Sequence, residues 1–413
     1  MSKSGLITAA LLVSSQGAHA QQLPAGAGGQ IQQIPPAPKA SQGDPDFRVK
    51  PRAVQADAGT AGARIQVRSL QVTGATLFSE ETLIAATAFR PGSELNLAEL
   101  RALAAKISAY YNERGYFLAQ AYLPAQSIDS GIVEIAVIEG RYGKVSADNK
   151  SNLSSGTAHA MVRGLNSGDI VASGPLERRL LLMSDIPGVH VNSVLTPGTA
   201  VGTSDLVAVL SQGRRITGST EADNAGNRYT GAYRLGGGIN INNPAGIGDM
   251  VSLRLLASTS SLGYGRAAYQ VPVGAATVGA AYTYIRYKLG RDFKSLRAEG
   301  NADIMSLFGS YPLIRSRSTN LYALGGIDAK RFEDKIGLDD SESRRRSRVL
   351  NFGLSGNSED RLGGGGRTVV SLGWTTGGPR GYFVRSNNEN VLSAITQCET
   401  VLATRSRSSD KQT

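Results

Sequence analysis

The sequence predicts an α+β protein in which two small β-α-α-β-β domains precede an antiparallel transmembrane β-barrel. Between residues 65 and 213, apolar residues at helical spacing alternate with short strand-like runs. From residue 214 onward, glycine-rich segments of about ten residues alternate apolar and polar side chains, which is typical of an outer-membrane barrel. No stretch approaches the ~20 consecutive apolar residues that a spanning helix needs.

The alternation is clearest in residues 233–242. The odd positions there are Tyr, Leu, Gly, Ile and Ile, whereas the even positions are Arg, Gly, Gly, Asn and Asn. Successive side chains of a strand point to opposite faces, so this pattern builds a sheet with one apolar and one polar surface. A soluble sandwich could share it, but glycine content and strand length favour a barrel. The expected strands, about nine in number, are 215–223, 229–242, 249–259, 264–273, 276–289, 298–313, 319–333, 346–357 and 366–376.

Two α+β units precede this sheet, at residues 65–141 and 142–213. In the first, Leu100, Leu103 and Ile107 recur at helical spacing and are expected to be core. In the second, Pro175 marks the start of a helix. The expected strands are 65–73, 116–123, 132–138, 142–147, 189–195 and 206–210, and the expected helices are 79–89, 97–114, 157–165 and 176–183.

The N-terminus has the three parts of a secretory signal peptide. Lys3 supplies positive charge, residues 6–14 form a short apolar core, and Ala18-His19-Ala20 is a small-residue cleavage site. We therefore expect residues 1–20 to be removed after Ala20. Residues 21–64 are rich in Pro, Gly and Gln and are expected to form a linker.

Several motifs, taken in order, resemble one family. These are Gly115-Tyr116 through Pro124-Ala125-Gln126, Ile138-Glu139-Gly140-Arg141-Tyr142-Gly143-Lys144-Val145, the segment 223–231, Asn243-Pro244-Ala245-Gly246-Ile247-Gly248-Asp249, and Tyr311-Pro312-Leu313-Ile314-Arg315-Ser316-Arg317. The chain resembles a two-partner secretion transporter of the TpsB type. That is the haemolysin secretion and activation family of the outer-membrane translocation and assembly superfamily. The resemblance covers residues 65–377.

This resemblance implies two periplasmic POTRA domains and a barrel in the cell outer membrane. It implies a transporter that recognises a secreted partner exoprotein, a large β-helical adhesin or haemolysin, and moves it to the cell surface without nucleotide hydrolysis. The further partners implied are outer-membrane lipid, periplasmic chaperones and the barrel-assembly machinery. No cofactor is implied.

The candidate site residues fall into two groups. An unpaired sheet edge can bind an extended peptide as an added strand, and the resemblance places that edge on residues 189–196 and 116–123. The candidate substrate-binding residues are Val189, Val191, Val194, Tyr116 and Leu118. The candidate pore-lining residues, on the polar face of the strands, are Arg234, Asn240, Arg254, Arg266, Gln270, Asp328 and Lys330.

Composition argues against other functions. The net charge is +11, but the arginines are spread among strands without an aromatic-basic patch, so no nucleic-acid partner is expected. Three histidines and the single Cys398 are scattered, without metal-ligand or nucleophile–base spacing, so we expect no catalytic residues, no metal site and no enzyme. The acidic run 339–342 and Arg344-Arg345-Arg346 beside it are expected to form a solvated outer loop.

The pattern stops before a barrel of the family's size is complete. The family implies sixteen strands, and residues 378–413 do not continue the alternation, so they are expected to be an off-pattern tail. The expectation is a barrel truncated at about nine strands, in a truncated or frame-shifted product. Two alternative functions stay open: a non-translocating periplasmic binding module with an incomplete barrel, and a general outer-membrane protein assembly factor.

Overall fold

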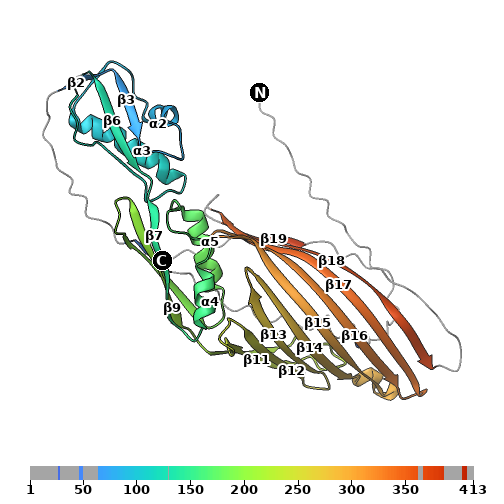
Figure 1. Ribbon diagram of the computed structural model, residues 1–413. Coiled ribbons are helices and arrows are strands. Elements are labelled where there is room, and N and C mark those ends of the chain that lie inside the picture. The colour runs from blue at the N-terminus through green and yellow to red at the C-terminus, as the bar shows by residue number, and fades with distance from the viewer. Residues whose placement is uncertain are drawn as a thin grey trace, which may run out of the picture.

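The computed structural model describes residue 27 and residues 46–49, 64–128, 130–360, 366–385 and 402–406. Figure 1 shows a first α+β domain in blue and cyan, a second in green, and a curved sheet in yellow to red. This order is the one expected from the sequence. The expected cleavage site at Ala18 and Ala20 lies outside the described residues. No described helix is long and apolar enough to cross a membrane.

The first domain packs two helices against a three-stranded sheet. Its elements are β2 (Ile65–Val67), β3 (Ser69–Thr73), α2 (Glu80–Thr87), β4 (Ser93–Leu95), α3 (Leu97–Glu113), β5 (Gln120–Tyr122) and β6 (Ile132–Ile138). In the sheet, β6 is central, with β3 parallel on one side and β5 antiparallel on the other. Helix α3 begins with a capping box between Asn96 and Glu99. Its buried face includes the predicted Leu100, Leu103 and Ile107.

The strand expected at 116–123 is shorter than predicted, because the residues at its start belong to the C-terminal cap of α3. Gly115 has a φ of 90° and donates its N–H to Asn112, while the N–H of Tyr116 bonds to the carbonyl of Tyr111. These two bonds form a Schellman cap. Only residues 120–122 remain as β5, at the edge of the sheet. Tyr116 and Leu118 precede the strand.

The second domain has a four-stranded sheet that includes part of the expected linker. Its elements are β7 (Arg141–Lys150), α4 (Ser155–Met161), α5 (Ser173–Ser184), β8 (Val189–Pro197) and β9 (Thr203–Gln212), joined by β1 (Asp46–Val49). The strand order is β1-β8-β9-β7. The core packs Leu176, Leu180 and Met183 of α5 against apolar residues of β8 and β9.

A buried carboxylate joins the two domains. The side chain of Glu139 is 2% exposed. It accepts hydrogen bonds from the backbone of Thr76 and Leu77 and from the Tyr111 hydroxyl. It also forms an ion pair with Arg141, which donates to the carbonyl of Gly168 in the second domain. Burial raises the pKa of Glu139, but these hydrogen bonds outweigh burial and hold its pKa below the usual value.

The C-terminal half is one antiparallel sheet with strands in sequence order. The strands are β10 (Ile216–Asp223), β11 (Arg234–Asn242), β12 (Met250–Ser258), β13 (Gly263–Val273), β14 (Ala276–Lys288), β15 (Ala298–Arg315), β16 (Thr319–Ile336), β17 (Ser341–Asp360), β18 (Gly366–Arg385) and β19 (Leu402–Ser406). The described residues thus contain ten sheet strands, against about nine expected. The segment 378–413, expected to be an off-pattern tail, supplies the end of β18 and all of β19.

The arginine run at 344–346 lies in a strand, so the loop expected there is wrong. Its register explains why. Arg344 and Arg346 alternate with Arg345, which points the other way and forms an ion pair with Asp334. Arg344 also pairs with Glu333 on β16, at 3.7 Å. Cross-strand pairs of opposite charge stabilise a sheet and allow charged residues to extend it.

The sheet has two unlike faces. The inner face carries Arg254, Thr283 and Lys330, whereas the outer face carries a band of exposed apolar side chains, which we call the apolar belt. The apolar belt comprises Leu235, Ile239, Ile241, Val251, Leu253, Leu255, Val278, Tyr282, Met305, Leu307, Ile327, Leu350, Phe352, Leu354, Val370, Leu372 and Trp374. The predicted alternation is therefore present in the fold.

Two turns of the sheet hold the second domain. In the turn after β11, the side chains of Asn243 and Asn152 bond to each other, and Ser154 donates to the carbonyl of Gly246. At the end of β15, Leu313 forms a bulge, and Arg178 of α5 donates to its carbonyl at 3.0 Å. These turns are two of the motifs that carried the family resemblance.

An ion pair strengthens the second contact. Arg315 donates to both carboxylate oxygens of Asp185, at 2.7 and 2.8 Å, and its side chain is 5% exposed. The backbone N–H of Arg317 donates to Glu177 across the same interface. Bidentate arginine–carboxylate pairs fix orientation as well as distance. The second domain is therefore held to one end of the sheet in a defined orientation.

We predict that Glu139→Gln loosens the first domain. The amide nitrogen of glutamine is a donor and cannot accept from Thr76 or Arg141, so the loss is about 2 kcal/mol. Hydrogen exchange at the amides of Thr76 and Leu77 measures this as a roughly 30-fold loss of protection. The exposed substitution Glu113→Gln in α3 is the matched control and leaves protection unchanged.

The same experiment has a pH dependence. Because the folded pKa of Glu139 is lowered, its stabilising effect is complete above the unfolded value of about 4.3 and is lost as pH falls below it. Protection in the unsubstituted chain, corrected for intrinsic exchange rates, therefore falls in acid, whereas the Gln variant shows a flatter profile. Parallel profiles would contradict this role.

We predict that Asp185→Ala frees the second domain from the sheet. The substitution leaves Arg315 buried without its carboxylate, which costs about 3 kcal/mol. The Arg317 amide reports directly on this interface, and its hydrogen exchange should accelerate on the order of 100-fold. Asp148→Ala removes the carboxylate of an exposed ion pair with Lys150 in the same domain, and should leave that amide unchanged. Equal effects of both substitutions would contradict the assignment.

Candidate functional site

The predicted substrate-binding edge on β8 is a real edge of the three-stranded core sheet, but it is already paired. Val189 and Val191 point into the core, at 6% and 4% exposure, and Val194 is half-buried. Val189 and Val191 are therefore packing residues, and an added strand would bind through the backbone of β8. β1 supplies such a strand in parallel register, from Asp46 opposite Asn192 to Val49 opposite Leu195.

The corresponding edge of the first domain is short. β5 offers residues 120–122, and the predicted Tyr116 and Leu118 are not part of it. Tyr116 packs edge-on against Phe78 and Tyr111. Leu118 packs instead against the core of the second domain. The structure thus makes Tyr116 a core residue and Leu118 a contact between the domains.

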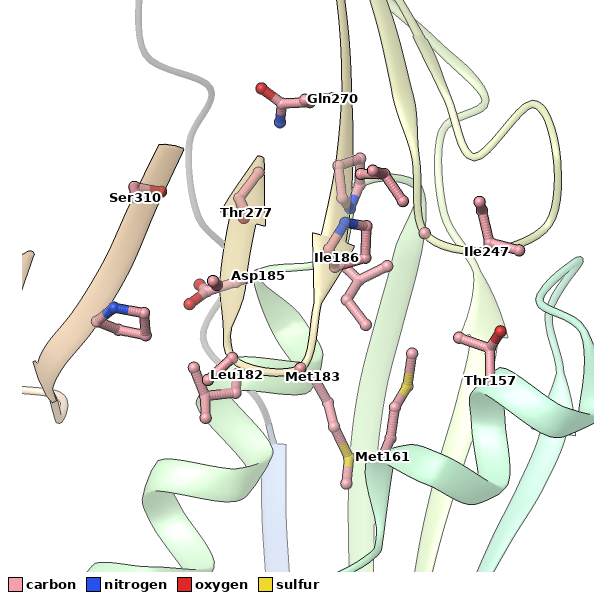
Figure 2. A pocket seen from close by; sticks show the side chains of 18 of the residues that line it. Thr157, Met161, Leu182, Met183, Asp185, Ile186, Ile247, Gln270, Thr277 and Ser310 are labelled. Carbon is pink, nitrogen blue, oxygen red and sulfur yellow. The ribbon is translucent and has the colours of Figure 1, made fainter. Parts of the chain in front are cut away.

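A cavity of about 710 Å³ lies between the second domain and the near end of the sheet. Figure 2 shows Met161, Leu182 and Met183 on its helical side and Gln270, Thr277 and Ser310 on its strand side. Methionine side chains are flexible and can pack against ligands of different shape. The cavity thus combines flexible apolar side chains on the helical side with a mixture of polar and apolar side chains on the strand side.

A second cavity, of about 890 Å³, continues along the inner face of the sheet. Phe308 and Ser310 line both cavities, so the two spaces adjoin. The second is lined by apolar residues and glycines together with charged residues, among them Arg254, Arg266 and Lys330. Between them, the two cavities extend from α4 and α5 to the inner face.

The seven predicted pore-lining residues all lie on the inner face. Arg254 and Arg266 are direct cross-strand partners on β12 and β13, and Lys330 lies in the same lateral line, through Thr283 and Ile304. Gln270 lies nearer the second domain, where it lines the first cavity. The structure brings these residues onto one surface, and their role in lining a pore stays a prediction.

Several of these charges are paired on the inner face. Arg234 bonds Asp223 at 2.8 Å, Arg254 bonds Glu221 at 2.6 Å, and Lys330 lies 3.4 Å from Asp328. Arg266 donates to the Thr283 hydroxyl. Such pairing orients long side chains along the wall and keeps them from filling the interior.

The expected linker also reaches the inner face at one described residue. Ala27 is fully buried in a cluster with Leu256, Ile285 and Tyr287. Its N–H donates to Asp334 at 3.0 Å. Asp334 also accepts from the Tyr287 hydroxyl and from Arg345. Residues before the first domain therefore contact both the inner face, through Ala27, and the β8 edge, through β1.

Sequence reasoning missed the residues that join the second domain to the sheet. Arg178 and Asp185 lie 135 and 130 residues from their partners Leu313 and Arg315, and no spacing rule pairs residues so far apart. The signal was present only indirectly, in the turn motifs at 243–249 and 311–317. Strand β1 was missed because four residues inside a Pro- and Gly-rich segment give no periodicity to detect. Among the described residues, no group of three or more His, Cys, Asp or Glu side chains could hold a metal ion.

Two family models match the chain. Residues 65–140 match the POTRA domain of the ShlB type, and residues 202–379 match the haemolysin secretion/activation protein ShlB/FhaC/HecB. The chain is 30% identical over 269 residues to the heme/hemopexin transporter protein HuxB of Haemophilus influenzae, covering 64% of this chain and 48% of HuxB. It is 24% identical over 322 residues to the outer membrane transporter CdiB of Dickeya dadantii, covering 76% of this chain and 56% of CdiB. It spans about half the length of these relatives.

Solved structures support the same fold. CdiB from Escherichia coli superimposes with a TM-score of 0.59 at 23% identity, covering 79% of this chain and 61% of CdiB. CdiB from Acinetobacter baumannii gives a TM-score of 0.53 at 20% identity, covering 85% and 68%. The first α+β domain is a POTRA domain of the ShlB type, and the sheet corresponds in fold to part of a β-barrel. That the second α+β domain is also a POTRA domain stays a prediction. With both family models matched in order, the chain resembles the ShlB/FhaC/HecB haemolysin secretion/activation family over residues 65–140 and 202–379.

Proposed function

We propose that this chain is an outer-membrane transporter that receives a secreted partner protein in the periplasm and moves it to the cell surface without nucleotide hydrolysis. The observation that carries the proposal is the pair of neighbouring cavities, sharing Phe308 and Ser310 in their walls, that extends from the second α+β domain to the inner face of the sheet. The ion pair between Asp185 and Arg315 holds that domain at the entrance. The names of the relatives, a transporter protein and outer membrane transporters, support the same function.

The proposed cargo is an extended polypeptide. An added strand binds through backbone hydrogen bonds, so the β8 edge selects for an extended conformation of the cargo and depends little on its side chains. The β8 edge accepts such a strand in this structure, because β1 occupies it. A large β-helical adhesin or haemolysin, exported unfolded and rich in strand-forming segments, fits this requirement. Folding outside the cell would then give the transport its direction.

The remaining partners follow from the two faces of the sheet. The apolar belt is suited to outer-membrane lipid, and a β-barrel in that membrane needs periplasmic chaperones and the barrel-assembly machinery to be inserted. We propose no nucleic-acid partner and no enzymatic activity. Transport accounts for the two neighbouring cavities and the family resemblance better than a non-translocating binding module or a general assembly factor does.

We predict that cargo in transit touches β8 and not the opposite edge of the same sheet. A photo-crosslinking residue at the exposed His190 of β8 should give an adduct with the secreted partner in intact cells. The matched control places the same group at the exposed Lys150 of β7, the other edge strand. Adducts of equal yield from both edges, or from β7 alone, would refute capture at β8.

We predict that β1 competes with cargo for the same backbone groups. Replacing Asp46–Val49 with a Gly/Ser segment of equal length removes the strand-forming residues and leaves the chain length unchanged. Each net hydrogen bond that cargo no longer has to displace contributes about 1 kcal/mol, so cargo affinity should rise at least roughly fivefold. Crosslinking yield from His190 at limiting cargo measures the change. A fall in yield would instead show that β1 is required for capture.

A further inference from the structure

The outer face of the sheet changes character at one level along its strands. Over about nine residues, roughly 25 Å of membrane depth for tilted strands, the outward residues of β16 and β17 are apolar or small. Beyond Ala329 and Leu350, away from the second domain, they become charged. The first charged residues are Arg331, Arg346 and Arg348, which we call the arginine row.

The arginine row is exposed and holds an excess of positive charge, since the three arginines have one carboxylate, Asp303, directly opposite Arg331 on β15. Arg331 and Arg346 are direct cross-strand partners, and Arg348 is the partner of Ala329, one step closer to the apolar belt. Like charges directly opposite each other destabilise a sheet. None of the three forms an ion pair with any described residue. An anion bound between them would remove this repulsion.

Nearby carboxylates are already engaged. Farther from the belt, Glu299 pairs with Lys288, and Glu342 pairs with Lys335 and Arg344. Asp303, the direct cross-strand partner of Arg331, accepts a hydrogen bond from the Tyr282 hydroxyl and forms no ion pair with a described residue. The cations farther out are thus held in ion pairs within the protein, whereas the three arginines beside the belt outnumber the one carboxylate next to them.

We propose that the arginine row binds the phosphate groups of an anionic glycolipid in the outer leaflet of the outer membrane, with its acyl chains against the apolar belt. The proposal rests on the proposed function, which places this end of the sheet at the cell surface. Guanidinium groups bind phosphate oxygens in a bidentate manner. Met305, Leu307 and Leu350 lie immediately below the row and offer an apolar surface to the acyl chains. Tyr282 and Tyr284, at the same level, fit the aromatic girdle of a membrane interface.

The test uses the full chain purified from outer membranes in detergent, with bis-phosphorylated lipid A as the probe. Lipid binding is measured at fixed salt with EDTA present, so that no divalent cation bridges the phosphates. The substitution R331Q/R346Q/R348Q should weaken binding about 100-fold, since each arginine near an anionic surface contributes roughly fivefold. Dephosphorylated lipid A should bind the unsubstituted chain with a comparable loss.

The matched control is K288Q/K335Q/R344Q. It removes the same charge from the same face, but from cations that are already paired and lie farther from the belt, and it should bind lipid A like the unsubstituted chain. Heat-modifiable migration in gels shows that both variants are folded. Equal binding of phosphorylated and dephosphorylated lipid, or equal losses in both variants, would overturn the proposal. Binding of an acidic polypeptide to the arginine row, with no binding of lipid A, would overturn it as well. The experiment measures lipid binding, so a negative result would leave the proposed transport function standing. Conversely, a failure to crosslink cargo at β8 would leave the lipid-binding proposal standing.

Discussion

The period-two alternation of side chains along β10 to β18 is the constraint on which the rest of the molecule depends. Shifting the pairing register of a strand by one residue would move all its side chains to the opposite face of the sheet, so the register determines the composition of both faces. The register places Arg254, Arg266 and Lys330 on the inner face and Leu253, Leu307 and Leu350 on the outer face. The same alternation explains how an arginine run can lie within β17. Arg345 turns inward to Asp334, while Arg344 and Arg346 face outward.

A sheet with a polar inner face is useful to a transporter only if cargo is delivered to it. The contacts between the domains hold the proposed cargo-binding domain next to that face. Glu139 of the first domain pairs with Arg141, whose guanidinium donates to the carbonyl of Gly168 in the second domain, and Asp185 with Arg315 ties the second domain to the sheet. Buried charged groups are costly when they lose their partners, so each joint resists bending. The contact between the second domain and the turns at 243–249 and 311–317 also borders the first cavity, which residues from α5 and from both turns line.

The parts that the sequence predicted are those that depend on local pattern. Leu100, Leu103 and Ile107 form the buried face of α3, and the alternating segments form strands, because periodicity reports which side of an element is covered. The family resemblance, carried by ordered turn motifs, was also confirmed. What those turns do was not predictable. Asn243 meets Asn152 and Arg315 meets Asp185 only after the chain has folded, and single-sequence reasoning cannot pair distant residues. The strand near Tyr116 failed for a local reason, since the helix cap at Gly115 uses the same residues.

The β8 edge shows why a weak contact can suit a transporter better than a strong one. β1 covers four residues of β8 in parallel register, which is less stable per residue than antiparallel pairing. It still satisfies backbone groups at an edge that would otherwise recruit any extended chain. An arriving cargo can therefore replace β1 at little net cost, because the backbone bonds lost and gained are of the same kind. Ala27 lies on the inner face while β1 lies on β8. Residues before the first domain thus contact both surfaces that the proposed function assigns to cargo, the inner face and the β8 edge.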